Sequence, residues 1–298
     1  MTWKKAASCK RKSTNKKTIQ RRQNNARRLV PLTVLALYVM TLAACARPDW
    51  GEVLQNKAAI GGGRQLLAAM AAAEKKCPLC RDADVNLTLK SPLKNVAASG
   101  YLLLARPSKI KFVSSNPFGQ PLLVASSDGT SFQQLSMLEK TYLHGRVFSY
   151  LARNNLPVAL AMANWVSWLT GGVGDIKVEE AEVRPDRQNR GLWFTWPLPE
   201  ARGIGENGVQ ERILVDTDRR LVIARVIKDG MGKTIARFDY GDRRADGPCP
   251  QPGRIVVSGL DGGAVIEMVF SGLGTPAECP EDSFELKQPE NFQEIYLP

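Results

Sequence analysis

The sequence predicts a mainly β protein of the α+β class, a strongly curved antiparallel half-barrel of about 10–12 strands with a plug helix and an N-terminal helix. Short segments rich in β-branched and aromatic residues follow one another from residue 85 to residue 271, with turn residues between them. One long apolar segment interrupts this series, and one helix-like segment precedes it. A sheet of this size with so few helices must curl, so its inside is either filled or holds a ligand.

The first half of the folded chain is expected to be a helix followed by a meander. Leu and Ala dominate residues 64–76, which predicts a helix there, whereas the three glycines at 61–63 should break or delay it. Turn chemistry such as Ser91-Pro92 and Asp128-Gly129 separates the segments that follow, and their even spacing is typical of antiparallel hairpins. Strands are expected over residues 85–89, 97–105, 110–113, 121–126, 131–135 and 141–143.

The apolar segment at residues 151–169 is hydrophobic nearly all round and ends at Gly171-Gly172. This pattern predicts a buried helix, and the part after Pro157 is too short to span a bilayer, which needs roughly 20 residues. We expect it to plug the concave face of the sheet. Strands should then resume over residues 177–183, 192–196, 213–216, 221–228, 234–240, 254–258 and 265–271.

The N-terminal residues have the pattern of a secretory signal peptide. Residues 1–29 contain eleven Lys or Arg and no Asp or Glu, and an uncharged apolar run follows to residue 44. That run is also shorter than a membrane-spanning helix needs. We therefore expect a signal peptide over 1–44, an anchor and linker over 45–63, and a folded domain over 64–298. The unusual length of the basic region leaves the true start codon open.

The signal peptide ends in Leu42-Ala43-Ala44-Cys45, which resembles the lipobox of bacterial lipoproteins. The resemblance implies that Cys45 is acylated and becomes the new N-terminus. The alternative is an ordinary cleavage site that contains a cysteine, but the motif lies at the correct end of the apolar run. Two or more acyl chains hold a protein on a membrane stably. Ala46, where an Asp would retain the protein at the inner membrane, implies a lipid-anchored, periplasm-facing place at the outer membrane.

Composition argues against nucleic acid as a partner. The formal charge of +12 comes from 41 Lys and Arg against 29 Asp and Glu, and the leader holds eleven of the basic residues, which leaves 30 against 29. A phosphate backbone needs a concentrated basic patch, and no such run is visible. An enzyme is poorly supported as well, because His144 is the single His and no GxSxG, HExxH or P-loop motif occurs. We expect no catalytic residue, cofactor or metal.

Four cysteines remain in the folded domain. Export implies an oxidising compartment, so these thiols are expected to form two disulfides, for which three connectivities are possible. The expected pairing is a local Cys77–Cys80 bond and a Cys249–Cys279 staple, and a four-thiolate zinc site is an alternative. The Cys77-Pro78-Leu79-Cys80 spacing also matches thiol oxidoreductases, but here the motif closes a helix-like run instead of opening one.

The segment from Asn116 to Pro121 interrupts two strand-like runs. Both prolines lack the N–H group that a ladder needs, and Gly119 tolerates a positive φ, so the segment should be a loop. Phe118 therefore lies at the tip of a turn. It either folds back onto the core or forms an exposed apolar probe for lipid or a partner.

In its loop at Asn116–Gly119 and in its helical segment, the chain resembles the LolA/LolB superfamily of lipoprotein carriers, and in particular the lipid-anchored outer-membrane receptors of that superfamily, LolB. Asn116-Pro117-Phe118-Gly119 is similar to the Asn-Pro-Leu-Gly loop of those receptors. Asn155-Leu156-Pro157-Val158, continued through Trp165, Leu169 and Gly171, is similar to the family's plug helix, and residues 254–270 also have a counterpart there. The resemblance covers roughly residues 83–272. The lipobox in the same chain strengthens it.

The resemblance implies an outer-membrane lipoprotein that accepts acylated lipoproteins or lipids from a LolA-type periplasmic carrier without covalent chemistry. Pro117, Phe118 and Gly119 would then form the membrane-insertion loop, with Phe118 in the place of the family's Leu. Sheet and plug helix would enclose an apolar cavity for acyl chains, for which we expect Leu102, Leu104, Phe112, Leu122, Trp165 and Trp168. The alternative is a lipid-anchored, non-catalytic periplasmic binding or structural lipoprotein with the same fold and a filled cavity.

Overall fold

The computed structural model describes residues 49–298 except for residues 93, 155, 158–159, 162–163, 199–207, 245–248, 250 and 277–278. The signal peptide and Cys45 therefore lie outside the described residues. Trp50–Pro298 forms one compact unit. Among the described residues, no helix combines the length and the apolar character that crossing a membrane would require.

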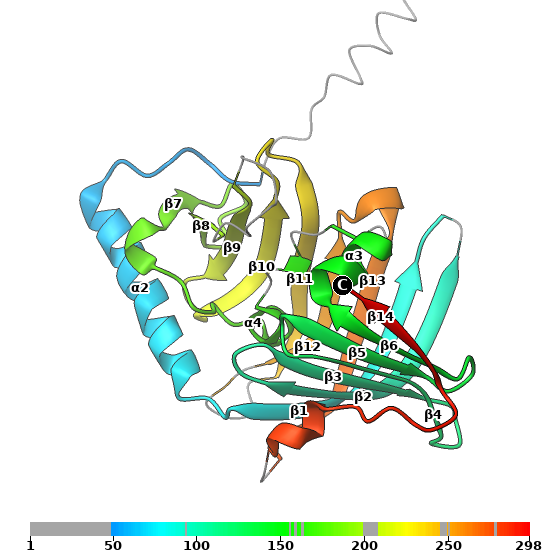
Figure 1. The fold of residues 1–298 in the computed structure, drawn as a ribbon. Helices are drawn as coiled ribbons and strands as arrows, with labels where there is room; N and C mark the ends of the chain where they lie inside the picture. Colours follow the sequence, from blue (N-terminus) through cyan, green and yellow to red (C-terminus); the bar gives the residue numbers. More distant parts are fainter. Residues whose placement is uncertain are drawn as a thin grey trace, which may run out of the picture. The chain divides into compact units, whose positions relative to one another are not determined.

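The described residues contain one open, curved sheet of fourteen strands (Figure 1). This confirms the predicted fold class, with more strands than expected. The strands are β1 (Cys80–Lys90), β2 (Asn95–Ala105), β3 (Lys109–Ser115), β4 (Pro121–Ser127), β5 (Ser131–Ser136), β6 (Thr141–Arg146), β7 (Glu182–Pro185), β8 (Leu192–Pro197), β9 (Gln210–Asp216), β10 (Leu221–Lys228), β11 (Thr234–Arg244), β12 (Gln251–Ser258), β13 (Val265–Gly274) and β14 (Gln293–Leu297).

The sheet consists of two meanders joined in its middle. β1 to β6 pair in sequence, β7 to β13 pair in sequence, and β1 pairs with β13 to join the two runs. Every pairing is antiparallel except that of β14, which lies parallel to β6 at one edge. β7 forms the other edge. The inner face of the curve is thus built by strands from both ends of the chain.

The N-terminal helix, α2 (Lys57–Lys75), is longer than expected. It runs through the three glycines, because Asn56 caps its first turn by accepting a hydrogen bond from the backbone N–H of Ala58 (2.9 Å). Gly63 is buried, and a Cβ atom there would lie 3.3 Å from Val183 Cγ1. The expectation that the glycines would break or delay the helix is wrong, since one of them permits close packing against the sheet.

The single plug helix expected over 151–169 is also wrong. The segment forms two short helices, α3 (Val147–Arg153) and α4 (Trp165–Thr170). Pro157 lies between them, and a proline removes a helical hydrogen bond and restricts the residue before it. Both helices nevertheless lie inside the curve of the sheet (Figure 1) and contribute to its main core.

Two further differences concern strands. Residues 178–180 form a 3₁₀ turn, Val178–Glu180, before the short strand β7, instead of the first part of a longer strand. Other 3₁₀ turns are Asp261–Gly263 and Glu281–Phe284. The strand β14 was not expected, because its pairing partner β6 lies far away in the sequence. We call residues 280–298 the C-terminal extension, and through β14 it forms part of the sheet.

The C-terminal extension also covers the convex face next to β3, β4 and β5. Leu286 packs in a cluster with Val124, Leu135 and Tyr142. The hydroxyl of Ser126 donates a hydrogen bond to the carbonyl oxygen of Phe284 (2.6 Å). This part of the convex face is therefore a small second core.

The disulfides pair Cys77 with Cys249 and Cys80 with Cys279. The expected pairing of Cys77 with Cys80 and of Cys249 with Cys279 is therefore wrong, and the thiolates of a zinc site are not free in this arrangement. The cause is topological. β1 begins at Cys80 and lies antiparallel to β13, so the end of β13 and the turn between β11 and β12 come to the same end of the sheet as the cysteine motif.

Candidate functional site

The inner face of the curved sheet encloses an apolar cavity of about 360 Å³. This volume lies within the range of about 300–1,000 Å³ typical of small-molecule pockets. Every side chain of its wall is apolar or aromatic. One wall comes from β1, β2 and β3 (Val85, Leu87, Leu102, Ile110, Phe112), and the facing wall from β11, β12 and β13 (Ala236, Phe238, Val257, Ile266, Met268).

Strand alternation explains why these residues meet. Successive side chains of a strand point to opposite faces, so Ile266 and Met268 face the cavity while Val269 lies on the other face, with 40% of its surface exposed. The β1–β13 register places Leu87 directly opposite Met268. The junction of the two meanders therefore forms the floor of the cavity.

The helical insertion covers the cavity on the remaining side. Tyr150, Leu151, Leu156 and Leu160 line it from α3 and the connection after it. The Tyr150 hydroxyl is not left unpaired, because it donates a hydrogen bond to Gln134 Oε1 (3.3 Å), and burial raises the pKa of this phenol.

The short helix α4 presents two different faces. Trp165 and Leu169, four residues apart, lie on the face toward the cavity. Trp168 points elsewhere and packs edge-on against Phe238, with ring centroids 5.2 Å apart. Asn164 begins the helix by accepting a hydrogen bond from the Ser167 N–H (3.1 Å), which sets the direction of both tryptophans.

Three of the six residues expected in the cavity line it, namely Leu102, Phe112 and Trp165. The other three do not. Leu104 is on the same face of β2 as Leu102 but lies deeper in the closed core. Leu122 lies at the irregularity in the β3–β4 register and outside the cavity wall, and Trp168 is fully buried behind the cavity.

The sequence did not single out the wall formed by β11, β12 and β13. Its apolar residues alternate as they should in half-buried strands, for example Ile266 and Met268. Alternation by itself does not say which face is concave. The pairing of β1 with β13 determines which face is concave, and no local sequence pattern predicts that pairing.

A buried charge pair lies beside the cavity. Arg225 and Glu211 form an ion pair with side chains 1% and 6% exposed, and the Arg225 Nε donates a hydrogen bond to the Tyr240 hydroxyl (3.2 Å). Tyr240 in turn donates to the Trp168 carbonyl oxygen (2.9 Å). Burial raises the pKa of Tyr240. The cluster ties α4 to β9, β10 and β11, which is a structural role.

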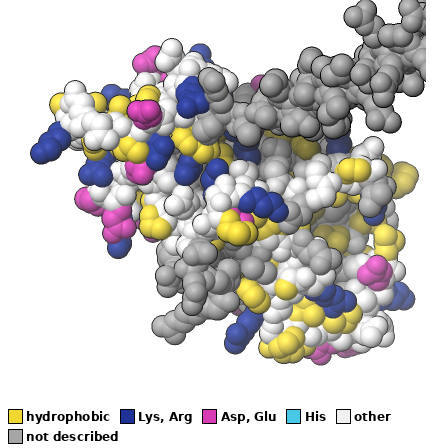
Figure 2. Space-filling view, turned by 90° about the horizontal axis from the view of Figure 1, so that it is seen from above, with side chains coloured by type: hydrophobic (Ala, Val, Ile, Leu, Met, Phe, Trp, Pro, Cys, Tyr) yellow, Lys and Arg dark blue, Asp and Glu magenta, His cyan; other side chains and the backbone are white. Residues whose placement is uncertain are grey.

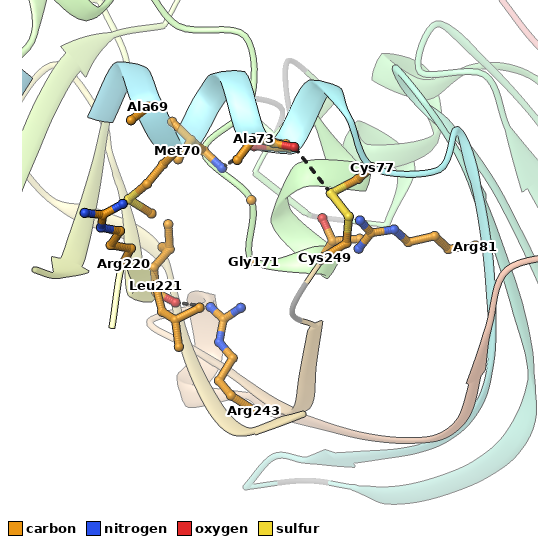
Figure 3. A pocket seen from close by; sticks show the side chains of 15 residues that line it. Ala69, Met70, Ala73, Cys77, Arg81, Gly171, Arg220, Leu221, Arg243 and Cys249 are labelled. Atoms are coloured by element: carbon orange, nitrogen blue, oxygen red, sulfur yellow. Dashed lines mark hydrogen bonds between the residues drawn. A yellow bond between two sulfur atoms is a disulfide. The ribbon is translucent and has the colours of Figure 1, made fainter. Parts of the chain in front are cut away.

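A second, smaller cavity of about 230 Å³ lies between α2, the end of α4 and strands β10 and β11 (Figure 3). Its lining is mixed, with the Cys77–Cys249 disulfide and the arginines Arg81, Arg220 and Arg243. Desolvation lowers the pKa of Arg243, whose guanidinium donates to the Val222 carbonyl oxygen. Arg243 thereby joins β11 to β10, and the charged lining makes this cavity different in chemistry from the apolar one.

The loop between β3 and β4 holds Phe118 outward, with 89% of its surface exposed. Asn116 Oδ1 accepts hydrogen bonds from the N–H groups of Phe118 and Gln120 (3.0 Å each), and Gly119 has φ = +79°. The interpretation in which Phe118 folds back onto the core is therefore wrong. The side chain of Asn116 thus fixes the loop conformation through hydrogen bonds, without packing of Phe118 against the core.

The remaining candidate residues are structural. His144 stacks on Tyr142 (ring centroids 4.9 Å apart) and its Nε2 lies 2.8 Å from Glu294 Oε1, which links β6 to β14. In the described part of the chain, no three His, Cys, Asp or Glu side chains come together as ligands for a metal ion. On the face drawn in Figure 2, Lys and Arg are interspersed with acidic and apolar side chains.

Fold and cavity together define a class, the open antiparallel half-barrel with a helical insertion and an apolar interior.

No protein-family model matches the chain, and no curated protein matches it. Among solved structures, the chain is similar to a DUF1329 family protein from Desulfovibrio piger (TM-score 0.52, 10% identity, 76% of this chain and 97% of that one). It is also similar to a putative outer membrane lipoprotein-sorting protein domain from Vibrio parahaemolyticus (TM-score 0.51, 10% identity, 76% and 97%).

A LolA superfamily protein from Nitrosomonas europaea matches with a TM-score of 0.48 and 12% identity over 75% of this chain and 97% of that one. At identities this low, a likeness shows a shared fold alone. The first two structures establish that the half-barrel is one already seen in solved proteins.

Proposed function

We propose that this protein is an envelope lipoprotein that takes acyl chains of lipoproteins or lipids into its apolar cavity and helps to place them in the outer membrane, as LolB-type receptors do. The observation that carries the proposal is the cavity between β1–β3 and β11–β13, whose wall is entirely apolar. An engineered or natural cavity of this kind excludes water and accepts apolar ligands.

Energetics supports a carrier function. Each CH₂ group of an acyl chain gains about 0.8 kcal/mol on leaving water for an apolar site. A bilayer offers a similar gain, so passing a chain from a cavity to a membrane is nearly balanced and needs no covalent step. A LolA-type periplasmic carrier is the partner that would deliver such a cargo.

Two sequence features support placement at the membrane. Cys45, in its lipobox-like motif, would carry the acyl anchor. Phe118, flanked by Pro117 and Gly119, would enter the headgroup layer as an apolar side chain already free of the core. Pro117, Phe118 and Gly119 together would form the membrane-insertion loop.

The test compares two neighbouring substitutions on β13. Met268→Trp fills the cavity, whereas Val269→Trp places the same side chain on the opposite face. Native mass spectrometry of protein incubated with an acylated lipoprotein on a LolA-type carrier should show bound cargo for the unmodified chain and for Val269→Trp. Met268→Trp should lower the bound fraction about tenfold, since it removes space for several CH₂ groups.

Equal loading of both variants would contradict the proposal. Absence of any cargo, lipoprotein or free lipid, from the unmodified chain would leave the alternative of a lipid-anchored, non-catalytic binding or structural lipoprotein with the same fold. Crosslinking in the envelope would then identify its protein partner.

A further inference from the structure

The most exposed large apolar side chains of the described residues are Phe118, Met231 and Leu138, with 89%, 85% and 79% of their surface exposed. They lie in three separate hairpin turns, between β3 and β4, β10 and β11, and β5 and β6. In each case the turn residues bond to one another and leave the apolar side chain outside. Asp229 Oδ1, for instance, accepts hydrogen bonds from the N–H groups of Met231 (3.0 Å) and Lys233 (2.8 Å).

The strand order places these three turns at the same end of the sheet. In an antiparallel meander alternate turns share an end, and the antiparallel β1–β13 pairing carries this rule across the junction of the two meanders. We call this end the cavity rim, defined by the described residues of its turns: 91–92, 94, 116–120, 137–140, 229–233 and 259–264. In Figure 1 the turns of the β10–β11 (yellow), β12–β13 (orange) and β1–β2 (cyan) hairpins follow one another from the top centre to the upper right.

The turns at the other end of the sheet have a different composition. Turns 106–108, 128–130, 186–191 and 217–220 contain no Phe, Leu, Ile, Met, Val or Trp. The exposed Leu79 also lies at that end, in the connection between α2 and β1. Among the hairpin turns that the structure describes throughout, large apolar tips thus occur at one end of the sheet.

The apolar cavity reaches the same rim. Leu260, in the turn between β12 and β13, and Ile266, next to the start of β13, belong to its wall. The exposed lysines Lys94 and Lys140 lie in turns of the rim, and Glu139 is exposed beside Lys140. The β10–β11 turn adds Lys233 and Asp229, so the rim carries charges of both signs, and its large apolar tips are what match the apolar boundary of a bilayer.

We propose that the whole cavity rim docks onto the bilayer, with Leu138 and Met231 entering the headgroup layer together with Phe118 at separate points around the cavity mouth. This inference builds on the proposed function, in which the Phe118 loop alone meets the membrane. Docking at several points fixes the orientation of the half-barrel, so that the mouth faces the lipid and an acyl chain can leave without crossing water.

The test uses the full chain, lipid-anchored in vesicles of phosphatidylethanolamine and phosphatidylglycerol. Single cysteines are introduced at exposed sites, Leu138→Cys or Met231→Cys at the rim and Gln188→Cys at the other end, and are labelled with an environment-sensitive fluorophore. Spin-labelled lipid should quench the labels at 138 and 231 about threefold more than the label at 188, because only the rim enters the headgroup layer. Equal quenching at both ends would overturn the proposal.

A second measurement removes the apolar tips. The double variant Leu138→Glu/Met231→Glu, labelled at Lys94→Cys, should lose quenching about threefold, since two carboxylates then face anionic headgroups. Leu79→Glu, which adds a charge at the other end, should leave it unchanged. Both rim side chains are largely exposed, so these substitutions leave the core intact, and near-ultraviolet circular dichroism checks this. Unchanged quenching in the double variant would contradict the proposal.

The two proposals fail in distinguishable ways. Cargo loading in solution, measured on the same variants, depends on the cavity and not on the rim. Normal loading without preferential quenching at the rim would remove the docking proposal alone. Preferential quenching at the rim without any loading would keep the docking surface and remove the carrier function.

Discussion

Asp186 is a buried carboxylate that organises the turn between β7 and β8. Its oxygens accept hydrogen bonds from the Arg190 guanidinium (3.0 Å) and from the Trp193 indole N–H (2.9 Å). Burial by itself would raise the pKa of Asp186, but these hydrogen bonds outweigh it and lower the pKa to about 2. A pKa below that of the unfolded chain means that the ionised carboxylate stabilises the folded state.

The sign of this shift predicts a pH dependence. Stability from Asp186 is fully present above the unfolded pKa of about 4 and is lost as the pH falls toward 2. The unmodified protein should therefore be more stable than Asp186→Asn at pH 7, and the difference should shrink as the pH falls from 4 to 2. Urea unfolding over this range measures it. Two parallel stability curves would show that Asp186 keeps an ordinary pKa.

The positions of some side chains could be predicted from the sequence, whereas those of others could not. The exposure of Phe118 is set by local groups, because Asn116, Pro117 and Gly119 define the turn within a few residues. Trp168 and Leu122, in contrast, are apolar residues in apolar segments, and only the packed structure shows that they do not line the cavity. Local turn chemistry is readable from the sequence, whereas the direction of a side chain in a packed segment is not.

At the scale of elements, the helical insertion is the least regular part of the fold. α4 spans only Trp165–Thr170, too short to be stable by itself, so its ends must be held. Asn164 caps the start, and Gly171 ends the helix with φ = +64°. The hydrophobic pattern predicted one buried helix here, but Pro157 lies within the segment and Asn164 begins a separate helix after it.

The cap of α4 gives a prediction for this element. Asn164→Ala removes the acceptor for the Ser167 N–H and should cost about 1 kcal/mol of unfolding free energy. Because α4 positions Trp165 in the cavity wall, the same variant should also bind acyl cargo more weakly. Denaturant unfolding and native mass spectrometry measure the two effects. Asn164→Asp keeps a capping oxygen and serves as the control. If both variants lost the same unfolding free energy and the same cargo binding, the hydrogen bond of the cap would not be the cause.

At the scale of the whole molecule, the two disulfides join parts of the chain that are far apart in sequence. Cys77–Cys249 spans 172 residues and Cys80–Cys279 spans 199. The second bond holds the start of the extension that supplies Leu286 to the convex core and β14 to the sheet edge. Long closed loops restrict the unfolded chain most strongly.

The pairing can be checked directly. Peptide mapping without reduction should recover Cys77 linked to Cys249 and Cys80 linked to Cys279, and recovery of a Cys77–Cys80 peptide would contradict the structure. Replacing Cys80 and Cys279 together by Ser should lower the unfolding free energy by about 2–5 kcal/mol. Hydrogen exchange should then be faster in β14 and β6, while β9 and β10 should be little affected.

Elements whose signals are local could be predicted from the sequence. Turn residues and alternation of apolar residues defined nearly every strand and, with so few helices, the curved antiparallel class. The way the ends of these elements meet could not be predicted, because the β1–β13 and β6–β14 pairings and both disulfides join segments separated by more than a hundred residues. Those long-range contacts determine which face of the sheet is concave. They thereby determine which residues form the cavity wall and which turns form its rim. Contacts over such distances produce no pattern in a short stretch of sequence. A cavity could therefore be expected from the sequence, but only three of the six residues expected to line it do so.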